Sequence, residues 1–388
     1  MRVLLLAHKP PYPIIDGGCK AIESSLMALV NAGVSVDLLT FTTHKHPGKG
    51  EWPNHENFNF YKVPIDTRVK TFPAIKALIQ NKSYNLNRFK SKAWRTQFQE
   101  LTSKNTYDII HAESLFSLAD LDWIKSITST PVIYRSHNVE ASIWFDLKEA
   151  SGGLKKPYLN LLAKQIKKAE MEIAKNVTGI IAIQFEDEKW YSDLGIQHTT
   201  TLLPSQDTFG DSDYKNNSFY HLGAMDWQPN LEGVQWLIEE IWPMVLKEIP
   251  EAKLSLAGKN FPKDVKGFKG INLEGEVESS HEFIQSHGIA LIPLKSGGGI
   301  KIKLLEAAAL GKPVVSTSKG LEGTDLGEDE VFLGNTAQEF ADAMIEAWKK
   351  EDVRGDKGRR LKTWARKNLG PEACQKSLVS FYKEILEA

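Results

Sequence analysis

The sequence predicts an α/β protein made of two parallel-sheet units. Short runs of apolar and β-branched residues alternate with helical patterns along most of the chain, which is typical of parallel strands covered by helices. The alternation stops at a polar, turn-rich segment, residues 204–218, and then begins again. The chain has 388 residues, which is enough for two ordinary domains with substantial cores.

The individual elements follow from local patterns, with apolar runs predicting strands and a 3.6-residue apolar period predicting helices. In the first half we expect strands at residues 3–7, 34–41, 58–63, 109–112, 132–135, 179–183 and 200–203, and helices near residues 19–31, 86–101, 158–175 and 185–193. In the second half we expect strands at residues 219–223, 254–257, 271–273, 289–293 and 314–317, and helices at residues 231–248, 300–310 and from about 336 to the end.

Composition and charge exclude several classes of protein. Hydrophobic residues make up 41% of the chain, charged residues 25%, and the net charge is −1, which argues against a nucleic-acid partner. The only cysteines are Cys19 and Cys374, so we expect neither a disulfide framework nor a zinc site, and we expect a reducing, cytoplasmic setting. No apolar run approaches the length that spans a bilayer.

Three consecutive glycines form the clearest candidate site. Gly297, Gly298 and Gly299 follow an expected strand and precede a helix expected from about Ile300. Glycine lets the backbone approach a ligand closely, and the unpaired amides of a first helical turn carry partial positive charge. The pattern therefore suits a phosphate group, although a tight turn explains it equally well.

Two charged side chains follow on the same helix. At 100° per residue, Lys303 and Glu306 share one face of this helix. Lys303 is suited to neutralise phosphate, and Glu306 is suited to accept hydrogen bonds from the vicinal hydroxyls of a ribose. The alternative is a surface ion pair that contributes a few tenths of a kcal/mol.

Four segments, in order, resemble GT-B glycosyltransferases, most closely family four of the retaining nucleotide-sugar enzymes. They are PPYPIIDGGCKAI at residues 10–22, RSHNVEA at 135–141, YHLGAMDWQPNLEGVQWLIEEIWP at 220–243 and GGGIKIKLLEAAALGKPVVST at 297–317. The resemblance implies two Rossmann-like domains whose parallel sheets face each other across a cleft. It implies an acceptor-side domain at residues 1–207, a nucleotide-sugar-binding domain at 208–370, and a C-terminal helix at 371–388 that crosses back to the first domain.

The resemblance also implies an activity. The enzyme would move a sugar from a UDP- or GDP-linked donor to a hydroxyl of a sugar or lipid-linked acceptor, with retention at the anomeric carbon and without a metal or other cofactor. Polysaccharide or glycolipid biosynthesis is the implied setting. Two alternatives stay open, namely a nucleotide-sugar epimerase of the same fold and a non-catalytic nucleotide-sugar-binding subunit.

On the donor side, the resemblance makes Glu306 the ribose ligand. The acidic residue that the family usually has eight positions earlier is replaced here by Gly298, so the amides of residues 297–300, Ile300 included, would serve in its place. The family's Arg and Lys after the first strand of this domain are also missing. Lys301 and Lys303 would then meet the diphosphate, with Lys303 favoured as a catalytic group, while Lys301 fits equally well as a solvated lysine.

On the acceptor side, the candidates follow the first and fifth strands. Gly17 and Gly18 either approach donor phosphate or acceptor, or form a simple turn. Asp16 either orients an acceptor hydroxyl or caps the next helix. His137 is expected to hold the transferred sugar or the acceptor and to assist deprotonation, and Asn138 lines the same side or orders the loop.

Several other patterns favour a structural explanation. We expect His111 and Glu113 to be satisfied within the fold, Asn230 to cap a helix, and the Asp-Ser-Asp triplet at 211–213 to be a solvated turn and not a metal motif. The missing GxGxxG fingerprint argues against a nicotinamide enzyme. The lysine-rich helix expected at residues 154–175 suits contact with an anionic membrane, or simply a solvated surface. The sequence does not fix the oligomeric state.

Overall fold

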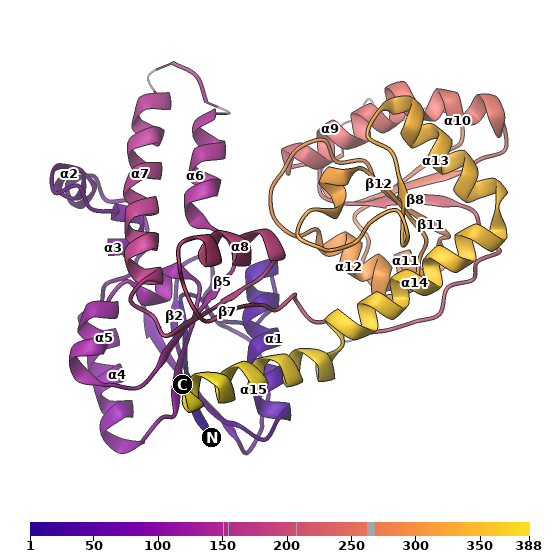
Figure 1. The fold of residues 1–388 in the computed structure, drawn as a ribbon. Coiled ribbons are helices and arrows are strands. Elements are labelled where there is room, and N and C mark those ends of the chain that lie inside the picture. The colour runs from indigo at the N-terminus through magenta and orange to yellow at the C-terminus, as the bar shows by residue number, and fades with distance from the viewer. Residues whose placement is uncertain (150, 154, 207, 262–267) are drawn as a thin grey trace. The chain divides into compact units, whose positions relative to one another are not determined.

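The computed structural model describes residues 1–149, 151–153, 155–206, 208–261 and 268–388. Contacts divide the chain into two compact units, one of residues 1–205 with 371–388 and one of residues 206–370 (Figure 1). Leu154, the first residue of the expected lysine-rich helix, and Asp207, the last residue of the expected first domain, lie outside the described residues.

The N-terminal unit contains a seven-stranded parallel sheet in the order β3-β2-β1-β4-β5-β6-β7. Its strands are β1 (Arg2–Ala7), β2 (Ser35–Thr42), β3 (Phe58–Pro64), β4 (Ile109–Glu113), β5 (Val132–Ser136), β6 (Gly179–Ala182) and β7 (Thr199–Thr201). Its helices are α1 (Gly17–Asn31), α2 (Thr71–Ile79), α3 (Tyr84–Asn87), α4 (Lys92–Lys104), α5 (Leu121–Ile127), α6 (Glu140–Glu149), α7 (Lys155–Ala174), α8 (Phe185–Asp193), α15 (Pro371–Glu387) and the 3₁₀ turn η1 (Leu115–Leu118).

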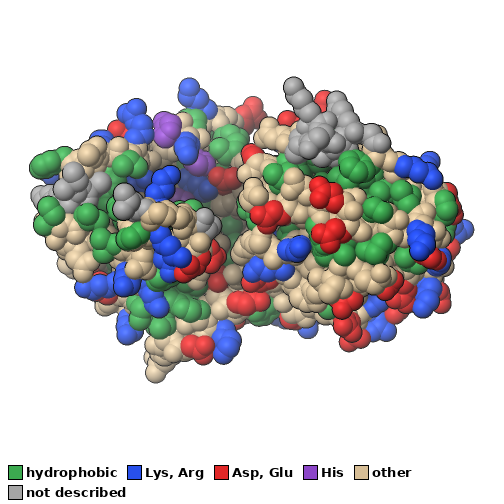
Figure 2. Space-filling view, turned by 90° about the horizontal axis from the view of Figure 1, so that it is seen from above, with side chains coloured by type: hydrophobic (Ala, Val, Ile, Leu, Met, Phe, Trp, Pro, Cys, Tyr) green, Lys and Arg blue, Asp and Glu red, His purple; other side chains and the backbone are tan. Residues whose placement is uncertain are grey.

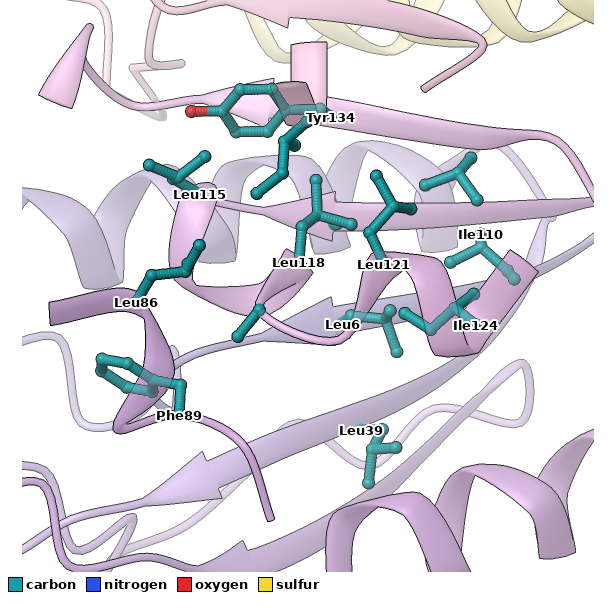
Figure 3. Close-up of a cluster of buried hydrophobic side chains, with 14 of the residues drawn as sticks. Leu6, Leu39, Leu86, Phe89, Ile110, Leu115, Leu118, Leu121, Ile124 and Tyr134 are labelled. Atoms are coloured by element: carbon teal, nitrogen blue, oxygen red, sulfur yellow. The ribbon is translucent and has the colours of Figure 1, made fainter. Parts of the chain in front are cut away.

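The central strand β1 explains why both faces of this sheet are covered. Successive side chains of a strand point to opposite faces. Val3 and Leu5 pack into one cluster with side chains of α1 and α15. Leu4 and Leu6 pack into the other, which includes side chains of α4 and α5 (Figure 3). The uninterrupted apolar run of β1 therefore reflects burial on two sides.

The C-terminal helix α15 is part of this N-terminal unit. Its side chains Leu378, Phe381 and Ile385 are buried in the cluster that also holds α1, and Figure 1 shows α15 beside α1. The approach to the sheet is close, because a Cβ atom at Gly179 would lie 2.9 Å from Ile385 Cδ1. The last turns of the chain thus complete the core of a unit that begins at residue 1.

The C-terminal unit repeats the same plan with a six-stranded parallel sheet in the order β10-β9-β8-β11-β12-β13. Its strands are β8 (Phe219–Leu222), β9 (Leu254–Ala257), β10 (Ile271–Gly275), β11 (Ile289–Ile292), β12 (Val314–Ser316) and β13 (Phe332–Leu333). Its helices are α9 (Gln228–Trp236), α10 (Trp242–Glu248), α11 (Ser280–Ser286), α12 (Ile302–Ala309), α13 (Ala337–Lys349) and α14 (Glu351–Leu369), with a π-helical turn η2 (Leu237–Ile241) and a 3₁₀ turn η4 (Ser318–Leu321).

The strand order is that of the Rossmann fold, in which the order reverses beside the first strand of the unit. In the N-terminal unit the reversal lies between β1 and β4, and in the C-terminal unit between β8 and β11. Ligands of such sheets bind at the carboxyl ends of the strands next to this point. The two reversal points therefore indicate where functional side chains should be sought.

The predicted α/β class with parallel sheets is confirmed. The short strand β13 and the helices α5, α6 and α11 were not expected. The single helix expected at residues 86–101 is wrong, because Ser83 caps α3 and Ser91 caps a separate α4. Helix α2 was not expected. Helix α12 begins at Ile302, so Ile300 belongs to the preceding loop. Within the described residues, no helix is both long and apolar enough to span a bilayer.

Candidate active site

The glycine loop after β11 has a backbone that only glycine adopts easily. Gly297 and Gly299 have φ angles of +91° and +80°, a region that costs other residues roughly 1–3 kcal/mol. A Cβ atom at Gly297 would also lie 2.7 Å from the Trp227 ring and 2.8 Å from Pro229 Cγ. Glycine is therefore required here because the loop packs directly against the segment that precedes α9.

Lys301 stabilises this loop through hydrogen bonds from its side chain. Its side chain is 3% exposed, and its ammonium donates to the carbonyl oxygens of Gly297, at 3.1 Å, and Gly299. Glu322 lies 3.7 Å away as a counter-charge. The alternative of a solvated lysine is wrong, because Lys301 occupies the N-cap position of α12 and points into the loop.

Lys303 lies where the loop after β8 meets α12. Its Nζ donates to Asn230 Oδ1 at 2.6 Å and lies 3.4 Å from His221 Nε2. A Cβ atom at Gly223 would lie 2.7 Å from this Nζ, so the glycine leaves room for the ammonium. The expected helix cap at Asn230 is wrong, since α9 begins two residues earlier and the Asn230 amide donates to Ala224 O.

The hydrogen-bond partners of Lys303 are neutral, so they add no negative charge that would hold the ammonium in its protonated form. His221 Nδ1 donates to Leu291 O at 2.9 Å, which leaves Nε2 as an acceptor for Lys303. Burial holds the pKa of His221 well below its usual value. Burial also lowers the pKa of Lys303 to about 7, and Lys301 adds to this effect while Glu306 opposes it. An anion that binds here would draw Lys303 fully into its charged form.

Glu306 lies one turn further along α12. Its Oε1 accepts a hydrogen bond from the Ser280 hydroxyl at 3.0 Å, and its side chain is partly exposed. Burial raises the pKa of Glu306, although the Ser280 hydrogen bond and Lys303 oppose this. Leu304 and Ala308, on the opposite face, are fully buried as expected. The helix thus presents a carboxylate and an ammonium while its other side anchors it.

This edge of the C-terminal unit combines three kinds of group suited to a nucleotide. The amides of residues 297–300 and the Lys303 ammonium offer positive charge, and Glu306 offers an acceptor for hydroxyl groups. All of them follow β8 or β11, the two strands that flank the reversal point. Such an arrangement can hold a diphosphate beside a diol.

In the N-terminal unit, Asp16 caps α1, which was one of its two expected roles. Asp16 Oδ1 accepts from Cys19 N at 2.8 Å, and the carboxylate also pairs with Lys9 Nζ at 2.7 Å and His46 Nε2 at 2.9 Å. Partial burial would raise its pKa, but these hydrogen bonds outweigh burial and hold the pKa far below its ordinary value. Its acceptor role stays a prediction.

The two glycines that follow Asp16 differ in what surrounds them. A Cβ atom at Gly18 would lie 2.6 Å from Lys9 Nζ, whereas one at Gly17 would meet nothing within 4 Å. Asp16, Cys19 and His46 place possible metal-binding atoms within 4.8 Å of one another. Because Lys9 already supplies a cation to Asp16, this group fits a metal ion poorly.

His137 follows β5 and pairs with a buried carboxylate. His137 Nε2 lies 2.5 Å from Glu113 Oε2, and Glu113 also accepts from His111 Nε2 at 3.0 Å. Burial alone would raise the pKa of Glu113, but the hydrogen bonds from His111 and His137 hold it far below the usual range. Asn138 contributes its backbone carbonyl to the Ser136 hydroxyl, at 2.8 Å.

Comparison with known proteins agrees with this geometry. Residues 216–350 match the family model described as glycosyl transferases group 1. The matched part of the C-terminal unit is therefore similar to group 1 glycosyltransferase domains. The matched residues contain the loop after β8, the glycine loop and α12, and with them the donor-binding candidates from Gly297 to Glu306, whereas Gly17 and Gly18 lie outside the match. Their individual roles stay predictions.

The whole chain has relatives in sequence and in fold. An uncharacterised 44.6 kDa protein in the cps region of Klebsiella pneumoniae is 24% identical over 369 residues, which are 89% of this chain and 90% of the relative. Sucrose-phosphate synthase from Thermosynechococcus elongatus superposes with a TM-score of 0.70 at 15% identity, covering 100% of this chain and 99% of the other. HepE of Anabaena, solved with UDP and glucose, gives a TM-score of 0.64 at 12% identity, with 99% and 100% coverage.

These findings confirm the GT-B glycosyltransferase resemblance, while membership of family four stays a prediction. Sequence reasoning did not identify His221 and Ser280, which have no signal beyond their position near strand ends. Glu113 did have a signal, because residues 111 and 113 of one strand point to the same face of the sheet, and His111 Nε2 does donate to Glu113.

One substitution tests the geometry of the glycine loop. Gly297→Ala should lower the free energy of unfolding of the C-terminal unit by about 1–3 kcal/mol, because alanine resists a positive φ and would press on Trp227. Gly327→Ala is the matched control, since a Cβ atom there meets nothing within 4 Å. Urea unfolding followed by tryptophan fluorescence measures both, and equal midpoints for the two variants would contradict the close packing.

Proposed function

We propose that this protein is a retaining glycosyltransferase that moves a sugar from a nucleoside diphosphate sugar to an acceptor hydroxyl. The observation that carries this proposal is Lys303, a partly buried ammonium between neutral Asn230 and His221, next to the amides of the glycine loop. No described carboxylate forms an ion pair with Lys303, and such a cation is suited to a bound anion. The donor would bind the C-terminal domain, residues 208–370, and the acceptor the N-terminal domain, residues 1–207.

In the proposed reaction the bond between the anomeric carbon and the diphosphate oxygen breaks, and a bond from the acceptor oxygen to that carbon forms. The proton of the acceptor hydroxyl passes to the imidazole of His137, which is expected to assist deprotonation. The leaving diphosphate carries away the electron pair, and its charge is met by Lys303 and the amides of residues 297–300. Lys301 shapes the loop that presents those amides. We propose that this positive charge suffices without a metal ion. Glu306 would hold the ribose.

The donor is proposed to be UDP-linked, with GDP as the second choice. The structural neighbour HepE binds UDP and glucose, which favours UDP. The relative from the cps region of Klebsiella pneumoniae supports a role in polysaccharide synthesis, and the resemblance of the glycine loop to family four supports retention. Both cysteines are buried, and neither forms a disulfide within the described residues, in keeping with the proposed cytoplasmic location.

Melting temperatures with added nucleotides test donor binding. A ligand at a hundred times its Kd stabilises a protein by about 2.7 kcal/mol if it binds only the folded state. We expect UDP to raise the melting temperature, GDP, ADP and NAD to raise it less, and Glu306→Ala to remove most of the UDP effect. Glu251→Ala, at an exposed turn before β9, should behave like the wild type.

The same series separates the alternatives. A shift with NAD alone would contradict a glycosyltransferase, and an unchanged UDP shift in Glu306→Ala would remove the ribose role. UDP-glucose is then incubated without an acceptor. Appearance of a second UDP-sugar would identify an epimerase, whereas binding with neither transfer nor slow hydrolysis would identify a non-catalytic subunit.

We also propose that the N-terminal unit touches an anionic membrane at the inner face, where a lipid-linked acceptor would lie. Helix α7 exposes Lys164, Lys167 and Lys168, and Figure 2 shows Lys and Arg side chains among hydrophobic ones on this unit. Helix α2 adds Phe72 and Ile79, whose side chains are 79% and 80% exposed. Residues 80–83, which directly follow α2, line a cavity together with residues of α7, so the end of α2 leads to the surface of α7. Basic and apolar groups together suit a lipid surface.

Sedimentation with vesicles tests this contact. The wild type should pellet with vesicles containing about one third phosphatidylglycerol and stay in solution with phosphatidylcholine alone. The double variant Phe72→Ser/Ile79→Ser should lose most binding, whereas Phe268→Ser, another exposed aromatic residue, should not. Equal pelleting of wild type and double variant would contradict the proposed surface.

A further inference from the structure

A buried chain of hydrogen bonds leads from the C-terminal helix to His137. The Tyr382 hydroxyl on α15 lies 2.5 Å from His111 Nδ1, although the two residues are 271 positions apart in sequence. His111 Nε2 lies 3.0 Å from Glu113 Oε1, and His137 Nε2 lies 2.5 Å from Glu113 Oε2. Tyr382, His111 and Glu113 are fully buried, and only His137, 9% exposed, reaches the surface.

The chemistry of this series of hydrogen bonds determines which nitrogen and oxygen atoms carry the protons. Glu113 is ionised, because the hydrogen bonds from both imidazoles outweigh the effect of burial on its pKa. A carboxylate only accepts, so both imidazoles donate from Nε2. Burial lowers the pKa of His111, so it is neutral and its Nδ1 accepts from Tyr382, whose own pKa burial raises well above the usual value.

The charge of Glu113 is balanced by another residue. Arg135 Nε lies 3.7 Å from Glu113 Oε2, and both side chains are fully buried. His137 therefore need not be an imidazolium to compensate the carboxylate. A neutral His137 that donates from Nε2 carries its lone pair on Nδ1. Among the described residues, no hydrogen bond to His137 Nδ1 is found.

His8, which follows β1, is a second imidazole with one nitrogen left as an acceptor, and it lies beside His137. The two ring centroids are 6.2 Å apart. His8 Nδ1 lies 3.4 Å from Glu113 O and donates to it, which leaves Nε2 as the acceptor. Burial first, and then His137 and Lys9, lower the pKa of His8 to about 3, so it is neutral at physiological pH. Two imidazole lone pairs thus occupy the same edge of the sheet.

We propose that Glu113, with His111 and Tyr382 behind it, positions an imidazole acceptor for a sugar hydroxyl. The imidazole is His137, and the bond it makes through Nδ1 requires a group that donates. A hydroxyl donates, whereas an ionised phosphate oxygen only accepts, so this edge suits a sugar hydroxyl and not the diphosphate. The inference rests on the proposed function and adds Tyr382, Glu113 and His111 as positioning residues.

A purely structural account explains these contacts less well. Buried charge is costly, and well-packed apolar residues often serve the fold equally or better. Here an ionised carboxylate is kept fully buried between two imidazoles, and the chain ends at the one side chain that solvent can reach. Helix α15 contributes to this chain through the Tyr382 hydroxyl, in addition to its apolar packing.

Histidine nitrogen NMR on the full chain tests the tautomer directly, without substrate. The His137 signals are assigned by their loss in His137→Gln. We expect Nε2 to be protonated and Nδ1 bare in the wild type, and a mixture of tautomers in Glu113→Gln. Tyr382→Phe should shift the same signals by less. Tyr107→Phe, which removes a buried hydroxyl bonded to Asp37 at 2.7 Å, should leave them unchanged. A wild-type His137 with Nδ1 protonated would overturn the inference.

Turnover of UDP-glucose separates positioning from structural loss. Glu113→Gln should lower kcat about ten- to hundredfold with the KM for UDP-glucose changed less than about twofold. If Glu113 acts through His137, the double variant Glu113→Gln/His137→Gln is no slower than His137→Gln alone, and independent, multiplied losses would contradict this. If the wild type does not turn over UDP-glucose, glucose is not the sugar that it transfers, and the tautomer result alone decides the inference.

Discussion

The candidate donor site depends on how one ammonium group is accommodated. Lys303 has room only because Gly223 lacks a side chain, and its partner His221 is an acceptor only because Leu291 O takes the other ring proton. The Asn230 amide donates to Ala224 O, which orients its Oδ1 as the acceptor for Lys303. His221 and Leu291 lie on β8 and β11, and Asn230 and Lys303 lie on the helices that follow these strands, α9 and α12. The parallel sheet therefore sets the geometry, and the charge of Lys303 follows from it.

Much of the fold was predictable because burial on two faces leaves a strong pattern. The apolar run at residues 3–7 and its counterparts identify every strand of both sheets except the two-residue β13, and a polar stretch at 204–218 marks the change of unit. Helix α2 was missed because its apolar side chains, such as Phe72, face outward, so they carry no signature of a core. The break between α3 and α4 depends on a local cap at Ser91.

The site was predictable in its glycines and less so in its polar contacts. Gly297 could be identified because left-handed backbone demands glycine, whatever the fold. Lys301 could not, because a lysine that folds back onto carbonyl oxygens has the same sequence appearance as a solvated one. Contacts between distant segments, such as Tyr382 with His111, leave no local pattern at all. Sequence spacing thus locates the loops, and tertiary structure assigns their partners.

Proton uptake on UDP binding tests the central claim most directly. Lys303 has a pKa of about 7 in the free protein, so at pH 8 it is largely neutral, whereas the terminal phosphate of UDP is already ionised. Calorimetry in two buffers of different ionisation enthalpy should report uptake of nearly one proton per UDP for the wild type, and none for Lys303→Arg, which is always charged. UDP binding without proton uptake by the wild type, at an affinity that Lys303→Met retains, would contradict the account.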